Sequence, residues 1–349
     1  MRKDPIGLEG VVVAHTEMSG IDGEAGRLVI GGEDVEVLAR GDLEATCARL
    51  WRMAPEQVGT ELARGRVLAF TALPRLGDAL ARHGGMDALR ASLAHLDDAA
   101  PGPIAGATAV FAAAWWRLHR GLDPVAPDPT LDHASDYWRM CIGRAPEPAV
   151  ARAIRAYLVT VSDHGMNAST FAARVVTSTR SDAVSAVVAA VGALKGPLHG
   201  GAPGPVLDML DAIGEPGRAE AWLRAELEAG RRIMGMGHRV YRVRDPRAAV
   251  LERCAHGIGG PRVELARVVE TVAARVLAER HPERRLCANV EFFTAVLLDA
   301  IGLDRAQFSP TFAVGRVAGW LGHIAEERER GRLIRPRARY LGGAGPMLA

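Results

Sequence analysis

Apolar and polar positions form short strand-like runs near the start of the chain and follow a helical period from about residue 42 onward. The three valines at 11–13, the turn-rich residues 20–23 and the apolar residues 28–30 predict one small β-hairpin within residues 10–38. Beyond it, Ala, Leu and Arg recur at helical spacing. The clearest breaks are predicted at residues 101–103, 124–129, 146–148 and 214–217. The predicted fold class is therefore all-α, with a small N-terminal β-hairpin.

The composition is that of an ordinary globular protein. The chain has 349 residues, 48% of them apolar and 24% charged, which excludes disordered, fibrous and disulfide-stapled classes and favours roughly two domains. The net charge of +2 gives no reason to expect a nucleic-acid partner. The longest apolar run, residues 104–116, is shorter than the roughly 20 residues that span a bilayer. We therefore expect a soluble, cytoplasmic protein with no membrane or nucleic-acid partner.

Four cysteines are scattered along the chain without a CxxC pair. This spacing argues against a zinc knuckle or a thioredoxin motif, and it predicts reduced thiols. The cysteines are Cys47, Cys141, Cys254 and Cys287.

Three polar segments interrupt the helical pattern, at residues 162–170, 195–203 and 234–247. A single histidine in a helical protein is more often structural than catalytic. His199 and His238 are different because each lies in a glycine-rich break, where the backbone can approach a ligand closely. Both are therefore candidate site residues.

Arginines concentrate in the third segment, with seven between Arg231 and Arg253 against only Asp245 and Glu252. A solvated helix face and a nucleic-acid patch are two interpretations. An anion site is the third, because arginine makes bidentate contacts with phosphate and carboxylate. The sequence Gly-Met-Gly at 235–237 lacks the third glycine and the preceding strand of a dinucleotide fingerprint, so a Rossmann fold is excluded.

A further candidate is Glu291, which is followed by two phenylalanines on a predicted helix. A partly desolvated carboxylate favours base chemistry, although an ordinary surface glutamate would show the same local pattern.

In this order along the chain, the segments resemble the citrate synthase family. The resemblance extends from residues 7–10, through 20–23, to 335–338, which is essentially the whole chain. No single motif is specific, but the ordered set is. The segments that carry it are DHGMNAST at 163–170, GPLHGG at 196–201, GMGHRVY at 235–241 and DPR at 245–247.

The resemblance implies an all-α homodimer with two domains: a large domain of residues 1–199 and 303–349, and a small mobile domain of residues 200–302. The implied reaction is condensation of acetyl-CoA with oxaloacetate, followed by hydrolysis of the citryl thioester, without a metal or other cofactor. The roles also follow from the resemblance. Glu291 would be the base, His199 the donor to the enolate oxygen, and His238 the group that polarises the oxaloacetate carbonyl.

The remaining implied site residues bind the two substrates. The oxaloacetate set is His164, Arg247, Arg316 and Arg335, with Arg335 coming from the other subunit. The CoA set is Arg242, Met234, Gly235, Met236 and Gly237.

Most of the family has aspartate at the position of Glu291, and a bacterial branch shares Asn-Val-Glu. Glutamate is one methylene longer, which bears on rate because a misplacement of about 1 Å can cost on the order of 100-fold. Three alternatives stay open: a 2-methylcitrate synthase that uses propionyl-CoA, a catalytically weak protein that binds CoA or a dicarboxylate, and a metal enzyme that uses His199, His238 and Glu291.

Overall fold

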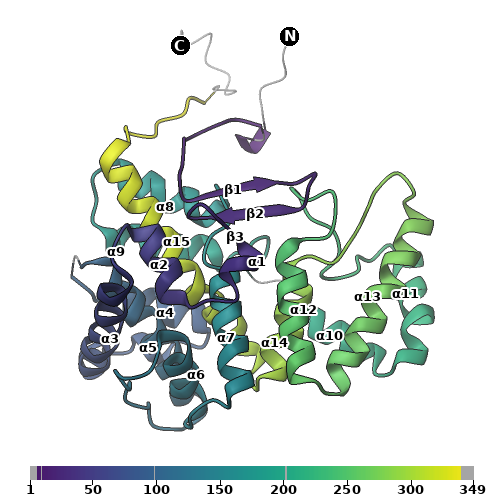
Figure 1. Ribbon diagram of the computed structural model, residues 1–349, viewed down its shortest axis with the longest axis horizontal. Helices are drawn as coiled ribbons and strands as arrows, with labels where there is room; N and C mark the ends of the chain where they lie inside the picture. The colour runs from purple at the N-terminus through teal and green to yellow at the C-terminus, as the bar shows by residue number, and fades with distance from the viewer. Residues whose placement is uncertain (1–5, 9, 98, 201–202, 339–349) are drawn as a thin grey trace, which may run out of the picture.

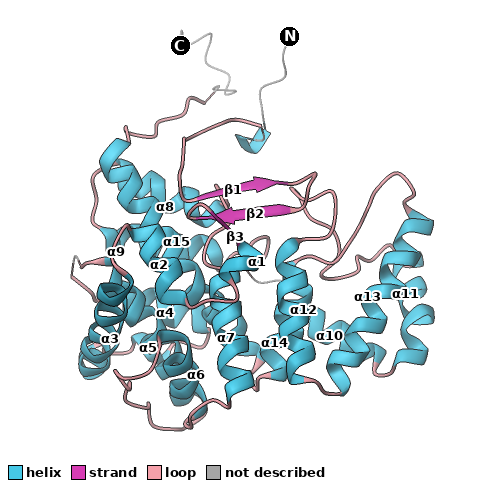
Figure 2. Cartoon of the chain, viewed as in Figure 1, coloured by secondary structure: helices cyan, strands magenta, loops and turns pink. Residues whose placement is uncertain are grey.

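Helices dominate the computed structural model, which describes residues 6–8, 10–97, 99–200 and 203–338 (Figures 1 and 2). Residues 1–5, 9, 98, 201–202 and 339–349, which belong to parts of the predicted motifs and domains, lie outside the described residues. The predicted fold class is confirmed. The helices are α1 (Val35–Leu38), α2 (Leu43–Trp51), α3 (Pro55–Ala72), α4 (Gly85–Leu93), α5 (Pro101–His119), α6 (His133–Ile142), α7 (Pro148–Thr160), α8 (Ala168–Ser178), α9 (Ala183–Leu194), α10 (Pro203–Ile213), α11 (Ala219–Glu228), α12 (Pro246–Ile258), α13 (Pro261–Arg280), α14 (Val290–Ala300) and α15 (Phe308–Arg330).

The N-terminal sheet has three short antiparallel strands in the order β1 (Ser19–Asp22), β2 (Arg27–Ile30) and β3 (Glu33–Asp34). The expected strand at residues 11–13 is wrong, and residues 20–22, expected in a turn, belong to β1. Three successive valines cannot all face a core, and Val12 is 78% exposed. The turn instead lies at residues 23–26, where the Asp22 carboxylate accepts the backbone N–H groups of Glu24 and Ala25.

Proline marks the starts of several helices. The predicted break at residues 101–103 is the first turn of α5, because proline at the first helical position costs no hydrogen bond. Helices α3, α7, α12 and α13 also have proline in their first turn.

Helix α15 is largely buried: every residue from Phe308 to Ile324 except Ser309 is inaccessible to solvent or nearly so. Two glycines let it approach the end of α7 and the segment that follows that helix. A Cβ atom at Gly315 would lie 2.9 Å from the Leu158 carbonyl oxygen, and one at Gly319 would lie 2.3 Å from the Ser162 carbonyl oxygen. Both helix and segment carry candidate site residues, so this close packing sets their separation.

Helices α10 to α14 gather on one side of the molecule, at the right in Figure 1, where α12 also packs on α7. Their residues fall within the predicted small domain, 200–302, and the boundaries of that domain stay a prediction. Within the described residues, no helix is both long and apolar enough to cross a membrane. All four cysteines are free thiols.

Candidate active site

Six of the predicted site residues converge from different parts of the fold. They are His164 before α8, His199 after α9, His238 before α12, Arg247 in α12, Glu291 in α14 and Arg316 in α15. The His164 and His238 rings lie 5.5 Å apart, centroid to centroid. The charges of Arg247 and Arg316 act on both His164 and Glu291.

His238 is held as one neutral tautomer. Its Nδ1 accepts the backbone N–H groups of Val240 at 3.0 Å and Tyr241 at 3.2 Å, so the proton must be on Nε2. Burial, with a further contribution from the positive charge of Arg247, lowers the pKa of His238 to about 4. Neutral His238 can therefore donate one hydrogen bond, from Nε2.

His199 is held in the opposite tautomer. Its Nε2 accepts the backbone N–H of Ser169 at 3.3 Å and lies 2.8 Å from the Ser169 hydroxyl, which leaves the proton on Nδ1. Burial and the charge of Arg316 lower the pKa of His199 to about 4. Ser169 is in the first turn of α8, whose positive end also disfavours an imidazolium.

Ser169 is itself fixed from two sides. Its hydroxyl oxygen lies 2.7 Å from Asn167 Oδ1, and it accepts the indole N–H of Trp320, in α15, at 3.1 Å. Asn167 is the N-cap of α8, and its Oδ1 also accepts the backbone N–H of Thr170. The orientation of His199 therefore depends on the start of α8 and on α15.

Glu291 supplies a carboxylate that is poised to take up a proton. Its Oε2 atom is excluded from solvent and has no hydrogen-bond partner. Burial raises the pKa of Glu291 to about 7, against the lowering effect of Arg247 and Arg316. Asn289 fixes the start of α14 by accepting the Glu291 backbone N–H at 2.9 Å.

Asp245 orients Arg247 at the start of α12. Its carboxylate accepts Nε and Nη2 of Arg247 at 3.0 and 2.8 Å, and it also accepts the Val290 backbone N–H at 3.2 Å. Burial lowers the pKa of this guanidinium, but Asp245, with smaller contributions from Tyr241 and Glu291, raises it above its ordinary value. One carboxylate thus ties the starts of α12 and α14 together.

Arg316 is a buried cation without a paired carboxylate. It is 1% exposed, its Nε donates to the Val161 carbonyl at 2.6 Å, and it stacks on Phe312. Among the described residues, no acidic side chain lies within ion-pair distance of it. Burial lowers the pKa of Arg316 to about 10. An uncompensated buried cation is costly, so the site is built for an anionic ligand.

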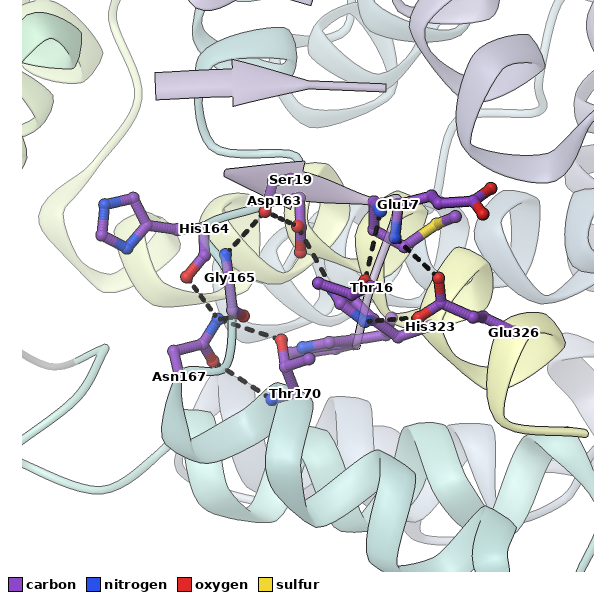
Figure 3. Close-up of polar contacts among 12 residues, drawn as sticks. Thr16, Glu17, Ser19, Asp163, His164, Gly165, Asn167, Thr170, His323 and Glu326 are labelled. Carbon is purple, nitrogen blue, oxygen red and sulfur yellow. Dashed lines mark hydrogen bonds and ion pairs between the residues drawn. The ribbon is translucent and has the colours of Figure 1, made fainter. Parts of the chain in front are cut away.

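A buried polar network supports the loop that carries His164 (Figure 3). The Asp163 carboxylate accepts from the Ser19 hydroxyl and from His323 Nε2, and the Ser19 hydroxyl accepts the Gly165 backbone N–H at 2.8 Å. His164 points away from this network, and its Nε2 lies 3.2 Å from the Tyr241 hydroxyl. Burial is the main cause, and the positive charge of Arg247 the next, that holds the pKa of His164 well below its usual range. The ring is therefore neutral.

The segment Met234, Gly235, Met236 and Gly237 pairs with residues 287–289, next to Glu291. The Gly237 backbone N–H donates to the Cys287 carbonyl, and the Asn289 amide donates to the Gly237 carbonyl. A Cβ atom at Gly235 would lie 2.8 Å from Cβ of Phe292, and its φ of +74° is a conformation that glycine adopts readily.

Two predicted residues lie apart from this cluster. Arg242 is exposed beside Glu24, and its backbone N–H donates to the Gly23 carbonyl. Arg335 is exposed after the end of α15 and makes no hydrogen bond or ion pair with any described residue. The structure describes a single chain, so a contribution of Arg335 across subunits stays a prediction. Within the described residues, no three His, Cys, Asp or Glu side chains are grouped so as to hold a metal ion.

Ser169, Tyr241 and Asp245 also contact predicted site residues, although the motifs that contain them predict no role for them. Asp245 followed by Pro246 is a helix-start signal that could have been read. Nothing in the local sequence indicates that Ser169 contacts His199, 30 positions away.

The fold and this set of groups define an acid–base enzyme for anionic substrates: two neutral histidines with fixed donors, one unpaired carboxylate and two buried guanidiniums. The family described as "Citrate synthase, C-terminal domain" matches residues 7–337. The chain therefore belongs to the citrate synthase family, whose members are acyl-transferring enzymes.

Individual relatives support this assignment over nearly the full length. The chain is 38% identical to "Putative citrate synthase 2" of Mycobacterium tuberculosis, over 97% of this chain and 93% of the relative. It is 37% identical to "2-methylcitrate synthase" of the same species, over 96% and 90%. A solved citrate synthase from Thermoplasma acidophilum, described as a ternary complex with carboxymethyl coenzyme A and oxaloacetate, is 28% identical with a TM-score of 0.85, covering 98% of this chain and 97% of that one.

Proposed function

We propose that the protein condenses acetyl-CoA with oxaloacetate and hydrolyses the citryl thioester to citrate and CoA. The observation that carries the proposal is the unpaired, solvent-excluded Oε2 of Glu291 in a site whose two neighbouring histidines are neutral. A carboxylate with a pKa of about 7 is a base matched to neutral pH.

Removal of the α-proton from a thioester leaves negative charge on the carbonyl oxygen. Glu291 takes up that proton, and His199 donates its Nδ1–H to the developing enolate oxygen. The low pKa of His199 keeps this donor neutral, so the stabilisation is a hydrogen bond from a preorganised group.

The α-carbon of the enolate then forms a bond with the carbonyl carbon of oxaloacetate, and the negative charge passes to the oxaloacetate carbonyl oxygen. His238 donates Nε2–H to that oxygen. Arg247 and Arg316 bind the two carboxylates, with His164 as a further hydrogen-bond partner. A dianion would compensate the charge of Arg316, which has no ion-pair partner among the described residues.

CoA is proposed to lie along Met234, Gly235, Met236 and Gly237, with Arg242 against its phosphates. The reaction then needs no cofactor beyond its substrates. We also propose a homodimer that supplies Arg335 from the partner, and a small domain of residues 200–302 that closes over oxaloacetate. Arg247 and His238 lie within this segment, while His164 and Arg316 lie outside it, so one dianion would bridge both bodies.

A second candidate is 2-methylcitrate synthesis from propionyl-CoA, favoured by the similarity to a relative of that name. One extra methylene in a pocket is worth only about 1–3 kcal/mol, so both substrates fit the same chemistry. Thiol release with each acyl-CoA and saturating oxaloacetate tests the proposal. We expect the higher kcat/KM with acetyl-CoA. A preference for propionyl-CoA would replace the main proposal by the second, and no thiol release with either would indicate a binding protein.

A further inference from the structure

A cavity of about 370 Å³ lies between α1, α7 and α12, which are side by side in Figure 1. It shares no residue with the active site. Its volume falls at the lower end of the range, roughly 300–1,000 Å³, that is typical of small-molecule pockets. The chemistry proposed above leaves this cavity without a role.

The charged groups that line the cavity are strongly unbalanced. Four arginines line it, Arg40, Arg152, Arg155 and Arg253, together with a single carboxylate, Glu36. By contrast, a smaller cavity of about 160 Å³ between α11 and α13 is lined by two arginines and two glutamates. Positive charge is therefore concentrated in the first cavity and balanced in the second.

Only two of the four arginines that line the cavity form ion pairs with described residues. Arg253 pairs with Glu36 at 3.0 Å, and Arg155 pairs with Asp132 at 3.2 Å. Within the described part of the chain, Arg40 and Arg152 have no ion pair. The Nε of Arg155 is excluded from solvent and has no acceptor, which is costly for a donor of this kind.

The rest of the wall is mainly apolar. Ala149, Ala153 and Ala156 come from α7, and Val250 comes from α12. A bare inorganic anion would leave this surface uncovered. A ligand with a charged end and a less polar body matches both parts of the wall, and guanidinium forks bind phosphate oxygens in a bidentate manner.

We propose that this cavity binds a small organic phosphate, with its phosphate groups against the four arginines and its body against the alanines and Val250. The site is separate from the catalytic one. It lies between α7 and α12, the helix that carries Arg247 in its first turn.

Calorimetric titration with uridine triphosphate tests the proposal. Inorganic pyrophosphate serves as a probe that has the phosphates without the organic part, and uridine as a probe that has the organic part without the phosphates. We expect saturable binding of uridine triphosphate, weaker binding of pyrophosphate and none of uridine. The double variant Arg40→Gln/Arg152→Gln should weaken binding by at least about tenfold, since it removes two charge-assisted contacts. It breaks no ion pair of the described residues, so its thermal unfolding should match the wild type.

Arg280→Gln, in the smaller and charge-balanced cavity, is the matched control and should leave the affinity unchanged. Alkylation of the half-buried thiols locates the ligand. Cys254 lines the proposed cavity, whereas Cys287 pairs with the segment proposed to bind CoA. Uridine triphosphate should slow alkylation of Cys254 severalfold and leave Cys287 unaffected.

Several results would overturn the proposal. One is the absence of binding at 10 mM uridine triphosphate, a concentration on the order of ten times a weak, millimolar dissociation constant. The others are equal binding by the wild type and the double variant, and protection of Cys287 in place of Cys254. Pyrophosphate binding as tight as that of uridine triphosphate would show that the apolar wall contributes nothing, and would remove the organic part of the assignment.

Discussion

The pH dependence of the reaction follows from the environment of Glu291. In the proposed reaction its carboxylate must be ionised to accept the α-proton, and burial raises its pKa to about 7. About nine tenths of the groups are ionised at pH 8 and about one tenth at pH 6, so kcat/KM for the acyl-CoA should fall roughly tenfold over this range. A carboxylate at the ordinary value of 4.5 would stay about 97% ionised at pH 6 and give almost no change.

The two histidines that we propose to act in catalysis do not obscure this measurement. Burial lowers the pKa of both His199 and His238 to about 4, so each stays neutral between pH 6 and 8. Initial rates of thiol release at saturating oxaloacetate and constant ionic strength give the profile, and the residual activity of Glu291→Gln should lack the step. A flat wild-type profile down to pH 6 would refute the reasoning.

Three further outcomes are expected. Asp245→Asn should lower the free energy of unfolding by about 3–5 kcal/mol in chemical denaturation, since it leaves Arg247 buried without its partner; an unchanged denaturation midpoint would contradict the role of this pair. Arg335→Ala should raise KM for oxaloacetate far more than KM for acetyl-CoA, and heterodimers with chains inactivated at His199 should regain activity; no rescue in verified heterodimers would count against a shared site. Oxaloacetate should change the X-ray scattering profile as a rigid-body closure would, and identical profiles with and without it would contradict a mobile small domain.

The helical fold could be predicted from the sequence because the apolar period persists through most of the chain. The sequence predicts the hairpin too early in the chain, because Val11 to Val13 have high strand propensity but do not alternate with polar residues. The pairing of Ser19 with Ile30 and of Ile21 with Leu28 depends on which residues the rest of the fold buries. Strand propensity alone does not contain that information.

The candidate site was predicted largely through ordered motifs, and six of its residues converge in the structure. Their protonation states could not be read from the sequence. The tautomer of His199 is set by Ser169, and that of His238 by the turn at Val240 and Tyr241. The raised pKa of Glu291 depends on burial by distant helices. Arg335 illustrates a further limit, since its expected contact is with a second chain.

The central claim, that Glu291 removes the α-proton of the acyl-CoA, is tested most directly by exchange of the acetyl protons of acetyl-CoA in deuterated water. A non-condensing oxaloacetate analogue occupies the site, so exchange is measured apart from carbon–carbon bond formation. Glu291→Gln keeps the size of the side chain and removes the base, and should slow exchange by at least about 100-fold. Glu291→Asp keeps a carboxylate base on a shorter side chain, so its exchange rate should lie between those of the wild type and Glu291→Gln. Exchange in Glu291→Gln as fast as in the wild type would show that another group takes the proton.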